Sequence, residues 1–126
     1  MDKKLGMHLQ MQMEWMLYQL TKDEAHKALK EVDRYETSHG VDIAEFDDTD
    51  GYKDAYCELT ETDDGWKQLW HRWNVLFDKQ MDYLRSFAAT VERFTDGRID
   101  EGTARQMAIS KPEDIERVLS LNMEVA

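Results

Sequence analysis

The stretch WKQLWHRWNVLFDKQMDYLRSFAATVERF (residues 66–94) decides the fold, because it carries one uninterrupted apolar stripe. Large apolar side chains recur along it every three or four residues, which is the spacing of one face of an α-helix. A single helix of this length is roughly 45 Å long, and its stripe must be buried to be stable in water. The stripe, which we expect to be mainly core, comprises Trp66, Leu69, Trp70, Trp73, Leu76, Phe77, Met81, Leu84, Phe87, Ala88, Val91 and Phe94.

The ends of this helix carry the residues that begin and end helices. Asp63 or Asp64 can cap its start, and Asp96-Gly97 supplies a stop. The sequence therefore predicts one helix over residues 65–95.

A helix of that length needs an equally long partner, and residues 3–38 can supply it. Apolar residues follow helical spacing from Leu5 onward, and Gly40 ends the element. The run from Thr21 to Glu24 has the pattern of a capping box, so we expect a bend or a short break near residue 21. The two long helices are predicted to pack antiparallel. The apolar positions of the first are Leu5, Leu9, Met13, Met16, Leu20, Ala25, Ala28, Leu29, Val32 and Tyr35.

The sequence of residues 100–122 predicts two short helices that cover one side of the pair of long helices. The run from Ser110 to Glu113 is a second capping box, with Pro112 in the first turn, where its missing N–H costs nothing. The expected fold is therefore all-α, a helical bundle with two long antiparallel helices, an acidic connecting segment and a C-terminal helical hairpin. At 126 residues, the chain is predicted to form a single domain, residues 1–126.

The charge is concentrated in the connecting segment. Residues 40–65 hold ten carboxylates and a single base, Lys53, so they carry −9 of the net charge of −11. A nucleic-acid binder needs lysine and arginine to displace counterions, and the cytoplasmic face of a membrane is itself negative. Both direct nucleic-acid binding and membrane binding are therefore disfavoured, and a basic protein is the expected partner.

The pattern of the connector is mixed. Val41, Ile43 and Phe46 can form a short strand, whereas residues 52–59 have helical spacing, with Asp50 as the expected N-cap. A β-hairpin about Asp50-Gly51 is the alternative to this short helix. The helical positions are Tyr52, Ala55, Tyr56 and Leu59.

The sequence predicts no catalytic, metal-binding or cofactor-binding residues. The run from Asp48 to Gly51 resembles the middle of a calcium-binding loop, but Phe46 and Cys57 would then occupy its first and last ligand positions. Glu36-x-x-His39 is only half of the pattern that di-iron bundles use. The single cysteine cannot form an internal disulfide, and no run of about 18 apolar residues exists, so a cytoplasmic location is expected.

Aromatic residues lie between the carboxylates of the connector, a combination typical of a protein-binding patch. We expect this patch to inhibit or neutralise a basic partner, such as a nuclease or a nucleic-acid-binding complex, with carboxylates in place of phosphates. Size, acidity and helical content are similar to those of immunity proteins for nuclease toxins and of phage proteins that block host nucleases or defence complexes. The predicted partner-binding residues are Asp42, Glu45, Phe46, Asp47, Asp48, Asp50, Tyr52, Asp54, Tyr56, Glu58, Glu61, Asp63 and Asp64.

Two other functions have some support in the sequence. Met7, Met11, Trp15 and Tyr18 form a second apolar face on the N-terminal helix, which suggests a homodimer or a structural or assembly-chaperone subunit. Glu58-x-x-Glu61 with Asp78-x-x-x-Asp82 could hold magnesium in a helical nucleotide hydrolase, although the spacing does not make a matched pair.

Overall fold

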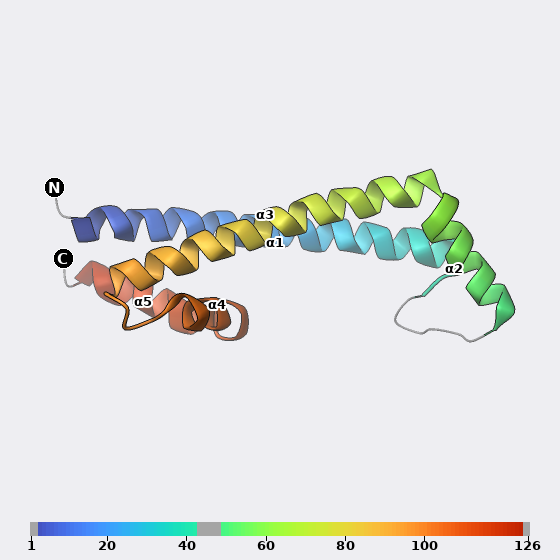
Figure 1. Ribbon diagram of the computed structural model, residues 1–126. Helices are drawn as coiled ribbons and strands as arrows, with labels where there is room; N and C mark the ends of the chain where they lie inside the picture. Colours follow the sequence, from blue (N-terminus) through green and yellow to red (C-terminus); the bar gives the residue numbers. More distant parts are fainter. Residues whose placement is uncertain (1–2, 43–48, 125–126) are drawn as a thin grey trace. The chain divides into compact units, whose positions relative to one another are not determined.

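The computed structural model describes residues 3–42 and 49–124, and every regular element within those ranges is an α-helix (Figure 1). The predicted all-α class is confirmed, with two long helices and a C-terminal hairpin. The segment around Asp50-Gly51 begins a helix rather than turning a β-hairpin. The helices are α1 (Lys3–Ser38), α2 (Asp50–Thr62), α3 (Asp64–Phe94), α4 (Glu101–Ser110) and α5 (Pro112–Glu124).

The chain divides into two compact units, and both long helices contribute to each of them. The first unit combines Met1–Thr21 with Lys79–Ala126, and the second is Lys22–Asp78. The expectation of a single domain stays a prediction.

Within each unit, α1 and α3 run antiparallel. In the first unit, Glu14 of α1 accepts a hydrogen bond from Thr90 of α3 at 2.7 Å. In the second unit, the later residue Glu31 of α1 pairs with the earlier residue Arg72 of α3 at 3.3 Å.

The core of the first unit lies between α1, α3 and the hairpin of α4 and α5. Tyr18, Phe87 and Met11 are its largest fully buried side chains. Ala104 and Ala108 of α4 are fully buried too, and their small size lets that helix approach closely. The buried cluster is Met11, Trp15, Tyr18, Leu84, Phe87, Ala88, Val91, Phe94, Ala104, Ala108, Ile115 and Leu119.

In the second unit, only part of the apolar stripe of α3 is buried. Trp66 is 8% exposed, but Trp70 and Phe77 expose 36% and 39% of their surface. Two of the α1 residues buried in this unit are Ala25 and Ala28, which have little apolar surface with which to cover large rings. The expectation that the stripe is mainly core is therefore met in the first unit and only partly in the second.

Local hydrogen bonds end both long helices where the sequence indicates. Gly40 has φ of 78°, and the backbone N–H of Val41 donates to the Glu36 carbonyl at 2.9 Å. At the end of α3, Asp96 has φ of 53° and Gly97 has φ of 81°. These left-handed residues let the chain turn back and satisfy carbonyls that the helix leaves open.

Three capping predictions were wrong. The Thr21 hydroxyl donates to the Leu17 carbonyl at 2.6 Å instead of capping a new helix, so α1 continues without a break. Thr49, not Asp50, is the N-cap of α2. Ser110 is the last residue of α4, and Lys111 separates it from α5, so the second capping box does not form.

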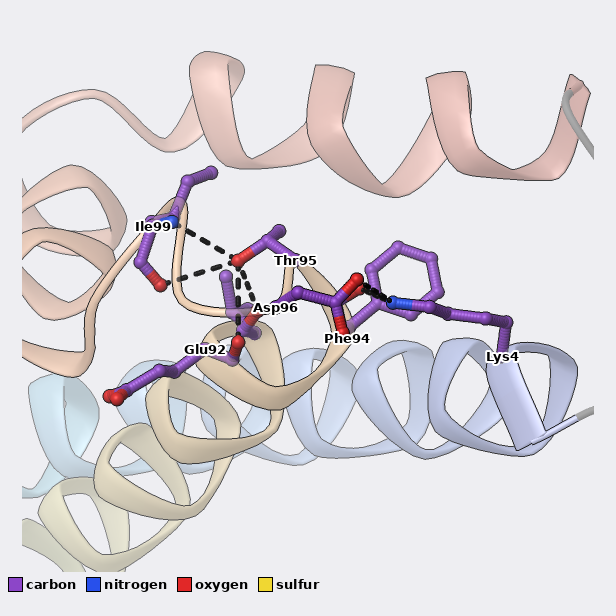
Figure 2. A network of polar contacts seen from close by, with 7 residues as sticks. Lys4, Glu92, Phe94, Thr95, Asp96 and Ile99 are labelled. Atoms are coloured by element: carbon purple, nitrogen blue, oxygen red, sulfur yellow. Dashed lines mark hydrogen bonds and ion pairs between the residues drawn. The ribbon is translucent and has the colours of Figure 1, made fainter.

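The turn between α3 and α4 is held by side chains as well as backbone (Figure 2). The Thr95 hydroxyl accepts a hydrogen bond from the Ile99 N–H at 3.1 Å. Lys4 of α1 donates to the Phe94 carbonyl and pairs with Asp96 at 3.0 Å. The first turn of α1 is thereby attached to the end of α3.

We expect Phe87→Ala to lower the free energy of unfolding by about 3–5 kcal/mol, because it leaves a cavity in a fully buried site. The matched deletion Phe77→Ala, at a side chain 39% exposed, should cost at most about 1.5 kcal/mol. Urea denaturation followed by circular dichroism measures both. Equal losses would contradict the burial described for the first unit.

Candidate protein-binding surface

Asp63 joins α2 to α3 and organises the end of the second unit. It is the C-cap of α2, and its Oδ1 accepts from the Trp66 N–H at 2.9 Å, which caps α3 as predicted. The same oxygen accepts from the Tyr35 hydroxyl of α1 at 2.6 Å. Gly65 leaves room for that hydroxyl, since a Cβ there would lie 2.6 Å from it. His39 lies 3.8 Å from the second carboxylate oxygen.

These contacts shift the ionisation of the carboxyl. The hydrogen bond from Tyr35, and then that from the Trp66 N–H, lower the pKa of Asp63 below its ordinary value. The same bond raises the pKa of Tyr35. Asp63 is therefore ionised at neutral pH, and its charge helps to hold α1, α2 and α3 together.

Glu36 is a buried carboxylate next to this junction. Its side chain accepts a hydrogen bond from the Trp66 indole N–H at 3.2 Å, and the residue is only 3% exposed. Burial raises the pKa of Glu36, the bond from Trp66 opposes that shift, and the nearby charges of Asp33 and Asp42 add to it.

One face of α2 packs inward against this end of the unit. Leu59 is buried, and Tyr52 and Tyr56 are half-buried beside it. The Tyr52 hydroxyl donates to the Asp42 carbonyl at 2.6 Å, which ties α2 to the residues that follow α1. Val32, Val41, Leu59 and Trp66 form the buried centre of this cluster.

The opposite face of α2 is an exposed acidic stripe, which we define as Asp50, Asp54, Glu58 and Glu61. Steps of four, four and three residues place these carboxylates along one side of the helix over roughly 16 Å. None of the four forms an ion pair with another residue that the structure describes. Among the residues that the structure describes, the stripe therefore presents negative charge without an ion-pair partner.

The residues predicted to bind a partner differ in exposure and in position in the structure. The fold brings the acidic stripe together on one helix face, and it leaves Asp42 and Asp64 exposed nearby in sequence. Tyr52 and Tyr56 pack inward against the cluster, and Asp63 is held within the junction. Four predicted residues lie outside the described ranges: Glu45, Phe46, Asp47 and Asp48.

Sequence reasoning missed the supporting role of Tyr35 and Glu36. Glu36 and His39 match only half of a di-iron pattern, and in the structure Glu36 accepts from the Trp66 indole while the Nδ1 of His39 lies 2.8 Å from the Tyr35 carbonyl oxygen. The partners of Tyr35 and Glu36, which are Asp63 and Trp66, lie 28 and 30 residues away along the chain, and no local spacing indicates such contacts.

Two general features of the described ranges bear on function. Within residues 3–42 and 49–124, no group of three or more His, Cys, Asp or Glu side chains is arranged to hold a metal ion. Among the helices in those ranges, none has the length and apolar character needed to cross a membrane.

Comparison of the chain with family models, with curated proteins and with solved structures finds no match. The fold and the charged surface together describe a small all-α protein with one acidic helical face.

We expect Glu36→Gln to gain stability relative to the wild type as pH rises from about 4 to about 7. The pKa of Glu36 is higher in the folded protein than in the unfolded chain, where it is ordinarily about 4.3. The protonated side chain therefore contributes stability below the unfolded pKa, and this contribution is lost as pH rises through the folded pKa. Glutamine keeps an oxygen acceptor for Trp66 without the buried charge. Urea denaturation across the pH range measures the difference.

Glu58→Gln, the same change at an exposed position of α2, is the control and should show little such trend. A stability difference for Glu36→Gln that stayed constant with pH would contradict the inferred cost of its buried charge.

Proposed function

We propose that this protein is a non-enzymatic binding module that neutralises a basic protein partner through the acidic stripe of α2. The observation that carries the proposal is the stripe itself, four exposed carboxylates on one helix face without ion-pair partners among the described residues. Like charges along one side of a helix repel one another, so the isolated protein gains no stability from this arrangement. A cationic surface would relieve the repulsion.

The distribution of charge between the units supports the proposal. The segment Lys22–Asp78 has sixteen acidic and seven basic residues, so it carries −9 of the total −11. The rest of the chain is nearly neutral. Such an asymmetric field would attract a positive partner toward the second unit and raise the rate of encounter.

The spacing of the stripe bears on the kind of basic surface it fits. Its carboxylates are spaced at roughly 5.5 Å along the helix axis, whereas one DNA strand presents a phosphate about every 3.4 Å along the duplex axis. The stripe thus carries less negative charge per unit of axial length than one nucleic-acid strand. The proposed binding does not require the stripe to reproduce the phosphate positions of DNA. Separate arginine and lysine side chains can each bind one carboxylate at this spacing.

A nuclease or another nucleic-acid-binding protein is the class of partner that we propose. The surfaces of such proteins that bind phosphates are rich in arginine and lysine. Occupation of such a surface by α2 would block access of the nucleic acid, which makes inhibition the expected outcome.

Neutralising the stripe in the variant D50N/D54N/E58Q/E61Q should weaken binding to a basic nuclease at least about tenfold, since each close charge pair contributes about 1 kcal/mol or more. Isothermal titration calorimetry of a panel of basic nucleases, at low and at high salt, measures this. A nuclease assay on each binder reports inhibition.

The matched control is D23N/E24Q/D78N/E116Q, which changes the net charge equally at exposed positions outside the stripe. It should retain binding within about twofold. Equal losses in the two variants would show that total charge, rather than the α2 face, governs the interaction. Absence of binding to every basic nuclease would remove the proposed partner class.

A further inference from the structure

The first turns of α1 expose an apolar face that the chain's own helices do not cover. Its members are each between 44% and 57% exposed, on the opposite side of α1 from the buried Met11, Trp15 and Tyr18. Together they present on the order of 400 Å² of apolar surface, as much as the largest patch on a typical monomer. The exposed face consists of Leu5, Leu9, Met13, Met16 and Leu20.

This face is the reverse of the one expected to mediate self-association. The residues proposed for that role, Met11, Trp15 and Tyr18, are inside the first core, where Met7 packs against them. Association through residues 5–20 of α1 would therefore use the exposed face.

Four residues of the exposed face have the spacing of a coiled-coil seam. Leu9, Met13, Met16 and Leu20 are separated by four, three and four residues, which is the a/d pattern of two heptads. The order Leu-Met-Met-Leu is the same in both directions. In an antiparallel pair, Leu9 would face Leu20 of a second copy, and Met13 would face Met16 of that copy.

The face is also free of charge, although the protein is highly charged. Glu14 is the only formally charged residue from Leu5 to Leu20, and it is buried, with hydrogen bonds from Ser86 and Thr90. Within residues 5–20, the polar neighbours of the seam are the glutamines Gln10, Gln12 and Gln19, and the charged residues Asp23 and Glu24 follow its end at Leu20.

Neutrality at this place favours a second copy over an unrelated partner. In a two-fold symmetric interface, the same patch of each copy faces the other. Any net charge on the patch would therefore face the same charge on the second copy and be repelled by it. An unrelated partner would impose no such requirement. Two copies that each carry −11 can approach with little local repulsion where the surface has no charge.

We propose that the exposed face of α1 pairs two copies of the chain as an antiparallel two-fold dimer, with Leu9, Met13, Met16 and Leu20 as the seam. This inference does not depend on the proposed binding to a basic partner. A seam of two heptads buries less than the roughly 800 Å² per partner of a standard interface. The expected dimer is accordingly one that dissociates in the micromolar range, with a state that depends on concentration.

Sedimentation velocity of the full chain, from about 1 to about 300 μM, tests the dimer. The wild type should shift from monomer to dimer, and the variant L9Q/M13Q/M16Q/L20Q should stay monomeric. The control Ile109→Gln removes an apolar side chain that is 56% exposed on α4, and it should dimerise like the wild type. Circular dichroism verifies that each variant keeps its helices.

A wild type that remains monomeric over the whole range, an assembly larger than a dimer, or a dimer that survives the seam variant would overturn the proposal. A dimer lost equally in Ile109→Gln would also count against the seam.

Disulfide trapping tests the direction of pairing. In a Cys57→Ser background, Leu9→Cys and Leu20→Cys proteins are oxidised separately and as a mixture. The antiparallel dimer predicts a cross-link between the two different variants, and little within either one alone. Efficient cross-linking of Leu9→Cys with itself would show a parallel pair and overturn the antiparallel geometry.

Discussion

The structure depends on burial of the apolar face of α3 against α1. An amphipathic helix in a protein derives most of its stability from packing, so each long helix depends on the other. α3 supplies Leu84, Phe87 and Val91 to one core and Trp66 to the other, and burying each large side chain contributes on the order of 1.5–3 kcal/mol. The shorter helices then pack onto what the long pair leaves uncovered: α4 and α5 in the first unit, and α2 in the second.

Two buried carboxylates on α1 add specificity to this pairing, one in each unit. Glu14 accepts hydrogen bonds from Ser86 and Thr90, and Glu36 accepts one from the Trp66 indole. A buried carboxylate that loses its donors costs far more than a displaced apolar contact. A shift of α1 along α3 by one turn would leave both carboxylates without these partners. Apolar contacts alone would permit more than one register of the two helices, and the polar contacts select one of them.

The two units present surfaces of opposite character. The acidic stripe of α2 is suited to a cationic partner, and the affinity of such an interaction would fall as the salt concentration increases. The exposed face of α1 is uncharged, and contacts between such faces are comparatively insensitive to salt. The two proposed interactions therefore use different residues and would respond to different conditions.

Periodicity and capping residues in the sequence determined that the chain is helical, and they located the ends of α1 and α3, because those signals act within a few residues. They favoured a short helix over residues 52–59 but left a β-hairpin about Asp50-Gly51 open, and it is the structure that places Asp50, Asp54, Glu58 and Glu61 on one face of α2. Only the tertiary structure decided which of the two apolar faces of α1 is buried, since Met11 and Leu9 belong to faces with equal helical spacing. The buried face packs against α3 together with the hairpin of α4 and α5. The burial of Glu36 likewise depends on Trp66, thirty residues away, and contacts at such separation leave no local pattern in the sequence.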